Sequence, residues 1–313
     1  MRKRRWIWAA TAAVIAVVVI ACVGGTKEGS RGILYEVRTE RSVMYLLGSI
    51  HIGESAMYPF GSEIQEALKQ AETFVFECDT DDAEATARMR ARMALPEGET
   101  LQAAVGEERY GQLRQVCEKL GMQPDALDGY QPWAAMNTLS VHTTAAEMGE
   151  DSLSRALSLG VEKRVKRQIG GRPVRYLETL DEQVDTLAGF SPALLDYLLA
   201  DECAVILGTA KPKGLDATVA SWPGWWKAGD AQAFAEQYLA GYPDPEHEAE
   251  SREYHNSLMT RRNERMADGL AALLEEGGTY FVTVGLLHLV LPEDSVTALL
   301  QARGYSVECV SQP

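Results

Sequence analysis

The two ends of the chain repeat one pattern, in which a strand is followed by Gly-x-x-His, a loop, a helix and a further strand. The motif occupies residues 48–51 in the first copy and residues 285–288 in the second. Neither copy alone makes a sheet with both faces covered, so the natural solution is for the two copies to pair around one sheet. If they pair with pseudo-twofold symmetry, His51 and His288, each just past a strand end, face one cleft.

The apolar patterns between and within these copies predict an α/β (α+β) fold with a central mixed sheet. Most of residues 99–240 have helical spacing, residues 249–275 form a long charged helix, and the Trp-rich residues 221–226 are expected to break the helices and to pack. The sheet units should cover about residues 31–98 and 276–313, with a helical insertion of about residues 99–275 capping the cleft. Strands are expected over residues 33–38, 42–47, 73–78, 172–177, 279–284 and 305–310.

The N-terminus is typical of an export signal. Residues 2–5 are basic and residues 6–23 are apolar, with small residues at the end of the stretch. Cys22 stands where a bacterial lipoprotein signal places the cysteine that becomes lipid-modified. An uncleaved membrane helix is a second interpretation, since such a stretch is near the length that spans a bilayer, and a simple cleaved signal is a third. All three make residues 1–30 a signal or anchor with a short linker, and they place the body outside the cytoplasmic membrane.

The charge balance restricts the partners of that body. The chain has 30 Lys and Arg against 45 Asp and Glu, a formal net charge of −15. Setting aside the four cations of residues 2–5 leaves a net charge of −19. A body this acidic is a poor nucleic-acid binder, because attraction to phosphate needs a basic surface. Nucleic acid is therefore excluded, and a peptide and the membrane are the expected partners.

The cysteines of the body leave their redox state open. An exported location permits disulfides, and four cysteines allow three pairings between which a sequence cannot choose. Buried free thiols are an equally open interpretation. Cys78 and Cys309 take equivalent positions at the ends of the two copies, which makes their pairing the one to check.

The pair of Gly-x-x-His motifs allows hydrolytic chemistry if a carboxylate joins it. Glu77 follows the apolar residues 74–76, and a buried carboxylate needs a partner. Two neutral imidazoles and a carboxylate, from His51, His288 and Glu77, suit Zn, Mn, Co or Fe(II) with positions left open for water and substrate. A metal-bound water would have its pKa lowered to about 7. The metal-free alternative makes His51 a general base oriented by Glu77, or the reverse.

Two further residues could assist. Glu178 ends another apolar strand and is a second carboxylate for the site. Arg262 lies on the charged helix before the second copy and could neutralise a carboxylate or an oxyanion. The remaining histidines are expected to be structural, and Asp79, which follows the same strand, is the weaker candidate carboxylate.

The order of these motifs resembles the TraB/GumN family, which is related to the TIKI proteins, over about residues 33 to 311. The matching runs are residues 45–51, 57–59, 75–79, 160–162, 176–179, 182–183, 226–230, 262–266, 284–289 and 304–307. The resemblance implies an active centre of paired Gly-x-x-His motifs and a Glu. TIKI proteins are described as metal-dependent proteases, and a wider kinship includes erythromycin-esterase-like and haem-binding ChaN-like proteins. Bacterial TraB relatives are linked to shutting down peptide pheromones.

These observations lead to one main hypothesis and two alternatives. The main hypothesis is an exported, membrane-anchored, metal-dependent hydrolase of the peptidase kind, in which His51, Glu77 and His288 hold the ion or perform the acid–base work. The first alternative is a binding protein that captures a peptide or haem without turnover. The second is a structural protein of the cell envelope with a degenerate site.

Overall fold

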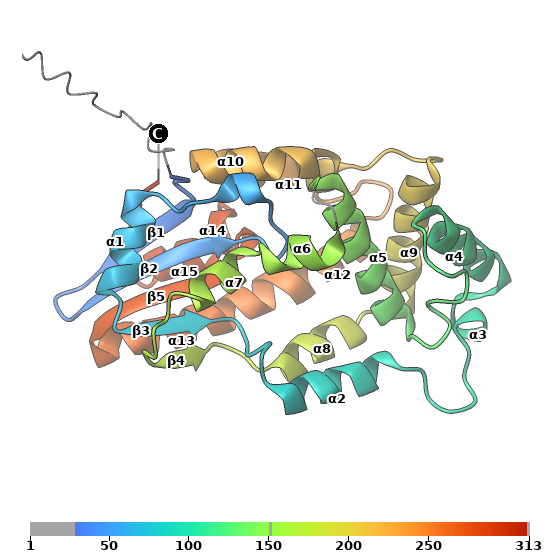
Figure 1. The fold of residues 1–313 in the computed structure, drawn as a ribbon, viewed down its shortest axis with the longest axis horizontal. Helices are drawn as coiled ribbons and strands as arrows, with labels where there is room; N and C mark the ends of the chain where they lie inside the picture. The colour runs from blue at the N-terminus through green and yellow to red at the C-terminus, as the bar shows by residue number, and fades with distance from the viewer. Residues whose placement is uncertain (1–28, 150–151, 312–313) are drawn as a thin grey trace, which may run out of the picture.

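The computed structural model describes residues 29–149 and 152–311. It confirms a mixed α/β fold around one six-stranded sheet, with strand order β4-β3-β5-β2-β1-β6 (Figure 1). The strands are β1 Ile33–Arg38, β2 Ser42–Ser49, β3 Thr73–Phe76, β4 Val174–Tyr176, β5 Gly278–Gly285 and β6 Val307–Cys309. The predicted signal with Cys22 lies outside the described residues. Within the described ranges, no helix combines the length and apolar character needed to cross a bilayer.

The pairing of β2 with β5 decides where the two copies of the motif meet. β1 and β2 form the predicted hairpin, with Arg38 opposite Val43. β2 and β5 then run parallel for eight residues, and Ser49 lies opposite Gly285. Both Gly-x-x-His segments therefore leave the sheet side by side at its carboxyl edge, as expected for two copies built around one sheet.

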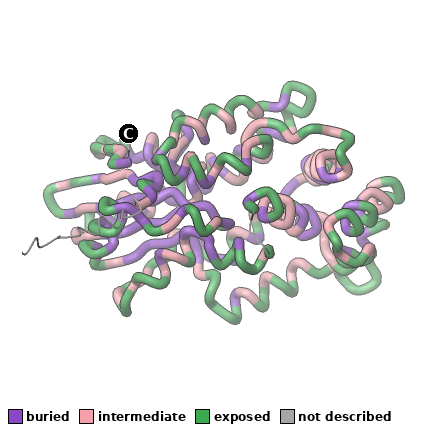
Figure 2. The backbone as a smooth tube through the Cα atoms, turned by 45° about the horizontal axis from the view of Figure 1, so that its top comes forward, coloured by how far each residue is buried: buried purple, intermediate pink, exposed green. Residues whose placement is uncertain are grey.

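The sheet is covered on both faces by helices from the two copies. On one face α1 (Ser62–Gln70) contributes Ile64 to the apolar cluster that also contains Phe74 and Phe281. On the other face α13 (Arg261–Glu276) and α15 (Val296–Ala302) pack Leu270 and Leu300 against alternate strand residues. The two-residue period of the strands sends one apolar set to each face, and Figure 2 shows the buried backbone concentrated in these strands.

The chain moves outward from the middle of the sheet in opposite directions. From β2 it passes over one face, by α1, to β3; from β5 it passes over the other, by α15, to β6. The strand order therefore reverses between β2 and β5. In open α/β sheets, ligands bind in the crevice outside the carboxyl ends of the strands at such a reversal.

A helical layer with its own core lies beyond these strand ends (Figure 1). Its centre is formed by α4 (Glu107–Lys119), α5 (Pro132–Glu147) and α9 (Pro192–Leu207), which bury Leu139 and Leu194. Within the predicted insertion of residues 99–275, β4 joins the edge of the sheet and α13 covers one sheet face. The other helices are η1 Ser55–Met57, α2 Ala83–Met93, α3 Leu101–Val105, α6 Leu153–Ser158, α7 Val161–Lys166, α8 Leu180–Ala188, η2 Gly214–Ser221, α10 Trp222–Ala228, α11 Ala231–Ala240, α12 Glu248–His255, η3 Asn256–Thr260 and α14 Leu287–Val290.

One detail of the predicted helices is wrong. Residues 221–226 do not break the helices, because α10 begins at Trp222 with Pro223 in its first turn, where a missing N–H costs nothing. The predicted charged helix of residues 249–275 is confirmed as α12, η3 and α13 in unbroken succession, and η3 is one turn of π-helix within it. Such turns widen a helix and occur often at functional sites, and this one ends two residues before Arg262.

The cysteines within the described residues form no disulfide. Cys78 follows β3 and Cys309 ends β6, four strand positions away in the sheet. At ~4.8 Å between neighbouring strands, that separation is about 19 Å, whereas a disulfide needs Cα atoms within about 7 Å. The Cys78–Cys309 pairing is therefore not formed, since equivalent places in the two copies lie on opposite sides of the sheet's centre.

Candidate active site

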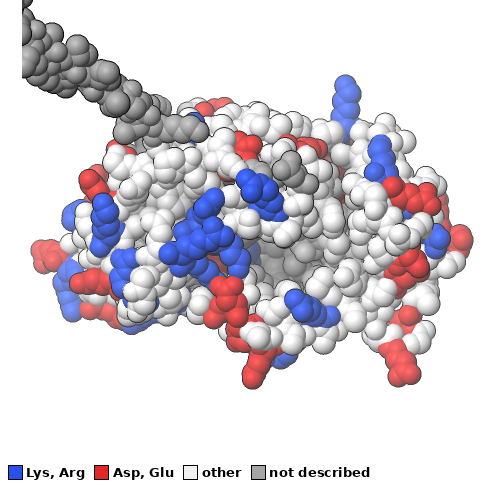
Figure 3. All heavy atoms as spheres, viewed as in Figure 1, with Lys and Arg blue, Asp and Glu red and all other residues white. Residues whose placement is uncertain are grey.

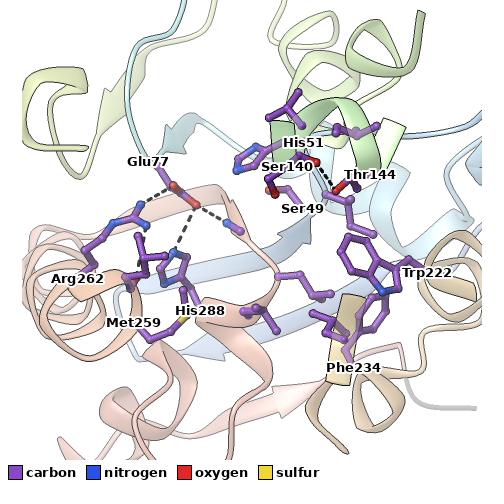
Figure 4. Close-up of a pocket in the computed structure, with 18 of the residues that line it drawn as sticks. Ser49, His51, Glu77, Ser140, Thr144, Trp222, Phe234, Met259, Arg262 and His288 are labelled. Carbon is purple, nitrogen blue, oxygen red and sulfur yellow. Dashed lines mark hydrogen bonds and ion pairs between the residues drawn. The ribbon is translucent and has the colours of Figure 1, made fainter. Parts of the chain in front are cut away.

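A cavity of about 370 Å³ lies at the carboxyl ends of β2 and β5. His51, Glu77, Arg262 and His288 line it, so four of the five predicted site residues surround one space (Figure 4). The fifth, Glu178, contacts Arg262 from behind. Figure 3 shows that the surface is hollowed beside α6 and α7, where Lys and Arg side chains gather.

Glu77 is a buried carboxylate, and both of its oxygens accept hydrogen bonds. Its Oε2 accepts hydrogen bonds from Arg262 Nη2 at 2.8 Å and from Gln183 Nε2 at 3.1 Å. Its Oε1 accepts one from the backbone N–H of Gly285 and lies 4.0 Å from His288 Nε2. Burial by itself raises the pKa of Glu77, but the charges of Arg262 and the two histidines outweigh it and lower the pKa to about 2. Glu77 is therefore held as an anion.

Arg262 lies between two buried carboxylates. Besides Glu77, it contacts Glu178, with Nη2 at 2.5 Å and Nε at 3.1 Å from Oε1. Burial lowers the pKa of Arg262, and the two carboxylates together raise it above the ordinary value. Gln183 donates to both carboxylates as well. The three charged residues, all under 9% exposed, form one fixed cluster at the wall of the cavity.

His51 stands on the opposite side of the cavity and is 70% exposed. Its Nδ1 lies 2.6 Å from Glu162 Oε1, and Ser49 Oγ donates to the same oxygen at 2.5 Å. The Glu162 carboxylate raises the pKa of His51 to about 9, although desolvation opposes it. His51 is therefore an imidazolium at neutral pH, with Nε2 as its remaining ring nitrogen.

His288 has the same motif position and the opposite electrostatic surroundings. It is the second residue of α14 and is 3% exposed. Its Nδ1 forms a 2.5 Å hydrogen bond with Asn263 Oδ1. Burial lowers the pKa of His288 to about 4, against the attraction of Glu77. Burial thus leaves this imidazole neutral at neutral pH, with the uncharged Asn263 amide as its hydrogen-bond partner.

Two glycines allow the side chains and backbone of the site to come close together. A Cβ on Gly285 would lie 3.1 Å from Glu77 Oε1 and 3.2 Å from the His288 ring. A Cβ on Gly160 would collide with the backbone carbonyl oxygen of His51. The close approach at Gly160 lets α7 begin against the first motif, and this brings Glu162 to His51.

Three partner residues were not assigned a role from the sequence. They are Glu162, Asn263 and Gln183, which hold His51, His288 and the two carboxylates in place. All three lie in the runs that carry the family resemblance, at residues 160–162, 262–266 and 182–183. That resemblance was the available signal, since no local pattern marks a residue as the partner of a distant histidine.

The residues fit a divalent ion in kind. Both imidazoles are anchored through Nδ1, which is the usual arrangement of metal-ligating histidines and leaves Nε2 for the ion. The three side chains do not meet at one point, because His51 faces Glu77 and His288 from across the cavity (Figure 4). Across the described part of the chain, no group of three or more His, Cys, Asp or Glu is arranged to hold a metal ion.

The Glu162–His51 pair gives a direct test of these electrostatics. In Glu162→Gln, the pKa of His51 is expected to fall from about 9 toward its ordinary 6.5, because the largest cause of the shift is removed. The measurement is an NMR titration of the His51 ring proton. Ser49→Ala is the matched control, since it removes a hydrogen bond to the same carboxylate but keeps the charge, and the pKa should stay near 9. An unchanged pKa in Glu162→Gln would contradict the pairing.

Comparisons with known proteins agree with the motif order. The sequence matches the TraB/PrgY/gumN family over residues 33–309. The uncharacterized protein YbaP of Escherichia coli (strain K12) is 24% identical over 249 residues, which cover 78% of this chain and 83% of YbaP. YbaP of Shigella flexneri matches to the same extent. No solved structure matches.

Proposed function

We propose that this chain, which belongs to the TraB/PrgY/gumN family, is a hydrolase that cleaves peptides, with His51, Glu77 and His288 as its catalytic residues. The observation that carries the proposal is the meeting of both Gly-x-x-His motifs and a buried carboxylate in one cavity at the reversal point of the sheet. A concave pocket that combines apolar walls with a few convergent polar groups of shifted pKa favours an active site.

Export and membrane attachment are part of the proposal. Their support is the basic segment of residues 2–5 followed by the apolar residues 6–23, with Cys22 as the site of lipid attachment. The body would then act outside the cytoplasmic membrane, on peptides that reach the cell surface. The negative net charge of the chain supports a partner other than nucleic acid.

Without an ion, the two histidines divide the acid–base work. His51, protonated at neutral pH, would donate a proton to the leaving amine, and neutral His288 would accept one from the attacking water. Environments that push two pKa values apart often mark such an acid–base pair. Glu77 would stabilise the charge that His288 gains, and Arg262 holds that carboxylate in place.

With an ion, the same residues would hold Zn, Mn or Co. His51, Glu77 and His288 are the proposed ligands, and the bound ion would supply a hydroxide near neutral pH. The anchoring of both Nδ1 atoms, by Glu162 and by Asn263, supports this form.

The test incubates the full chain with a mixed peptide library and identifies products by mass spectrometry. We expect cleavage by the wild type and its loss in His288→Ala. Elemental analysis and chelation separate the two forms: the metal form predicts a stoichiometric ion that His51→Ala loses, and the acid–base form predicts activity that survives chelation. No cleavage with any ion would contradict a hydrolase. Stoichiometric capture of a peptide or of haem without cleavage would support the binding alternative.

A further inference from the structure

The cavity has two chemically different ends. Glu77, Arg262 and His288 lie together at one end, and Trp222 and Phe234 lie at the other (Figure 4). The charged and imidazole side chains that line the cavity all belong to the proposed catalytic site; they are His51, Glu77, Arg262 and His288. The aromatic end contributes no charged side chain; its polar atoms are few and include the Thr144 hydroxyl and the Trp222 Nε1, which has no hydrogen-bond partner among the described residues. Burial of an ionised group there would therefore be costly.

The apolar walls come from segments far apart in the sequence. They are Val141 on α5, Leu215 on η2, Trp222 on α10, Phe234 on α11 and Leu286 after β5. Convergence of five separate segments gives a concave surface that no single helix could provide.

Packing behind the wall keeps this end open. The Phe234 ring is 1% exposed and lies edge-on to Trp225, with ring centroids 5.4 Å apart. Trp222 rests on the same ring at 6.4 Å. Aromatic rings held by such contacts do not collapse readily into an adjoining space. The whole cavity, of about 370 Å³, falls within the size range of small-ligand pockets, and burying an apolar group at its aromatic end would release water from both surfaces.

We infer that the aromatic end is a specificity pocket for one bulky apolar side chain, such as Phe, Leu or Met, beside the peptide bond that is cut. The inference rests on the proposed function for the cut, while binding of the side chain does not depend on turnover. The charged end receives the peptide group, and the apolar end receives the side chain, so one substrate spans both. Discrimination against alanine at this position should be tenfold or more, because one methylene in an apolar pocket is worth about 10- to 200-fold.

The α10 helix offers a matched pair of variants. Trp222 and Trp225 are both half-buried and both contact Phe234, but only Trp222 lines the cavity. We expect Trp222→Ala to lower kcat/KM for a Phe-containing peptide at least tenfold, and to leave the matching Ala-containing peptide within about threefold. Trp225→Ala should preserve the preference for Phe. Leu215→Phe, which fills the pocket instead of enlarging it, serves if Trp222→Ala does not fold, and it should also reduce the preference for Phe.

A binding measurement separates this inference from the proposed function. N-acetylphenylalaninamide and N-acetylalaninamide are titrated into the wild type and the variants by NMR. Tighter binding of the Phe amide by at least tenfold, lost in Trp222→Ala and kept in Trp225→Ala, supports the pocket even if no peptide is cleaved. Cleavage with no preference between Phe and Ala peptides, or equal binding of the two amides, would overturn the inference and leave the hydrolase intact.

Discussion

Replacement of Arg262 by alanine is expected to lower the free energy of unfolding by about 3–5 kcal/mol at neutral pH. The variant leaves Glu77 and Glu178 buried, 8% and 7% exposed, without the guanidinium that contacts both. Desolvation of these charges is then no longer offset. Urea unfolding followed by circular dichroism measures the change.

The loss of unfolding free energy in Arg262→Ala should become smaller as the pH falls. The pKa of Glu77 is lowered from 4.5 to about 2, so its contribution to stability is present above pH 4.5 and is lost as the pH falls toward 2. In Arg262→Ala, the pKa of Glu77 rises because the largest of the causes that lower it is removed, so protonation relieves the unpaired charge at a higher pH than in the wild type. The difference between wild type and variant should therefore shrink between pH 4.5 and pH 2.

Arg265→Ala is the control for this experiment. Arg265 lies 3.6 Å from Glu178 but is 47% exposed, and exposed pairs contribute about 0–1 kcal/mol. If Arg262→Ala were no more destabilising than Arg265→Ala, the two buried carboxylates could not both be charged in the folded protein.

The second large effect is on turnover. We expect Glu77→Gln to reduce peptide hydrolysis by about 10²–10⁴-fold, the range for loss of a general acid–base step, because His288 would lose the carboxylate that supports its protonation. The amide has nearly the shape of the carboxylate but cannot balance a charge on His288, which lies 4.0 Å from Oε1. Initial rates on the peptide cleaved by the wild type, with circular dichroism as the check on folding, give the measurement.

Asp79→Asn is the matched control for Glu77→Gln. Asp79 follows the same strand two residues later, lies outside the cavity, and is 3.9 Å from Lys166. Its removal should change the rate less than twofold. Full activity of Glu77→Gln would reduce Glu77 to a structural partner of Arg262 and would contradict its proposed role in the reaction.

Much of the sheet could be predicted because its signals are local. The alternation of residues 33–38, the apolar run that became β5, and the polar residues around each are properties of short windows. The repeat of Gly-x-x-His further indicated that two strand ends meet, and β2 and β5 are indeed adjacent. The helix at α10 was missed because a Pro-Gly pair looks like a breaker unless it falls in the first turn.

The sequence by itself determined the strands, their two-sided apolar pattern, the paired motifs and the family, because periodicity and motif order are written along the chain. Only the tertiary structure decided that the Glu162 carboxylate keeps His51 protonated while burial keeps His288 neutral. It alone also placed Trp222 opposite Glu77 across one cavity. The physical reason is that electrostatic and packing energies depend on distances of a few ångströms through space, and residues distant in the chain reach them only once the sheet and its helical layer have formed.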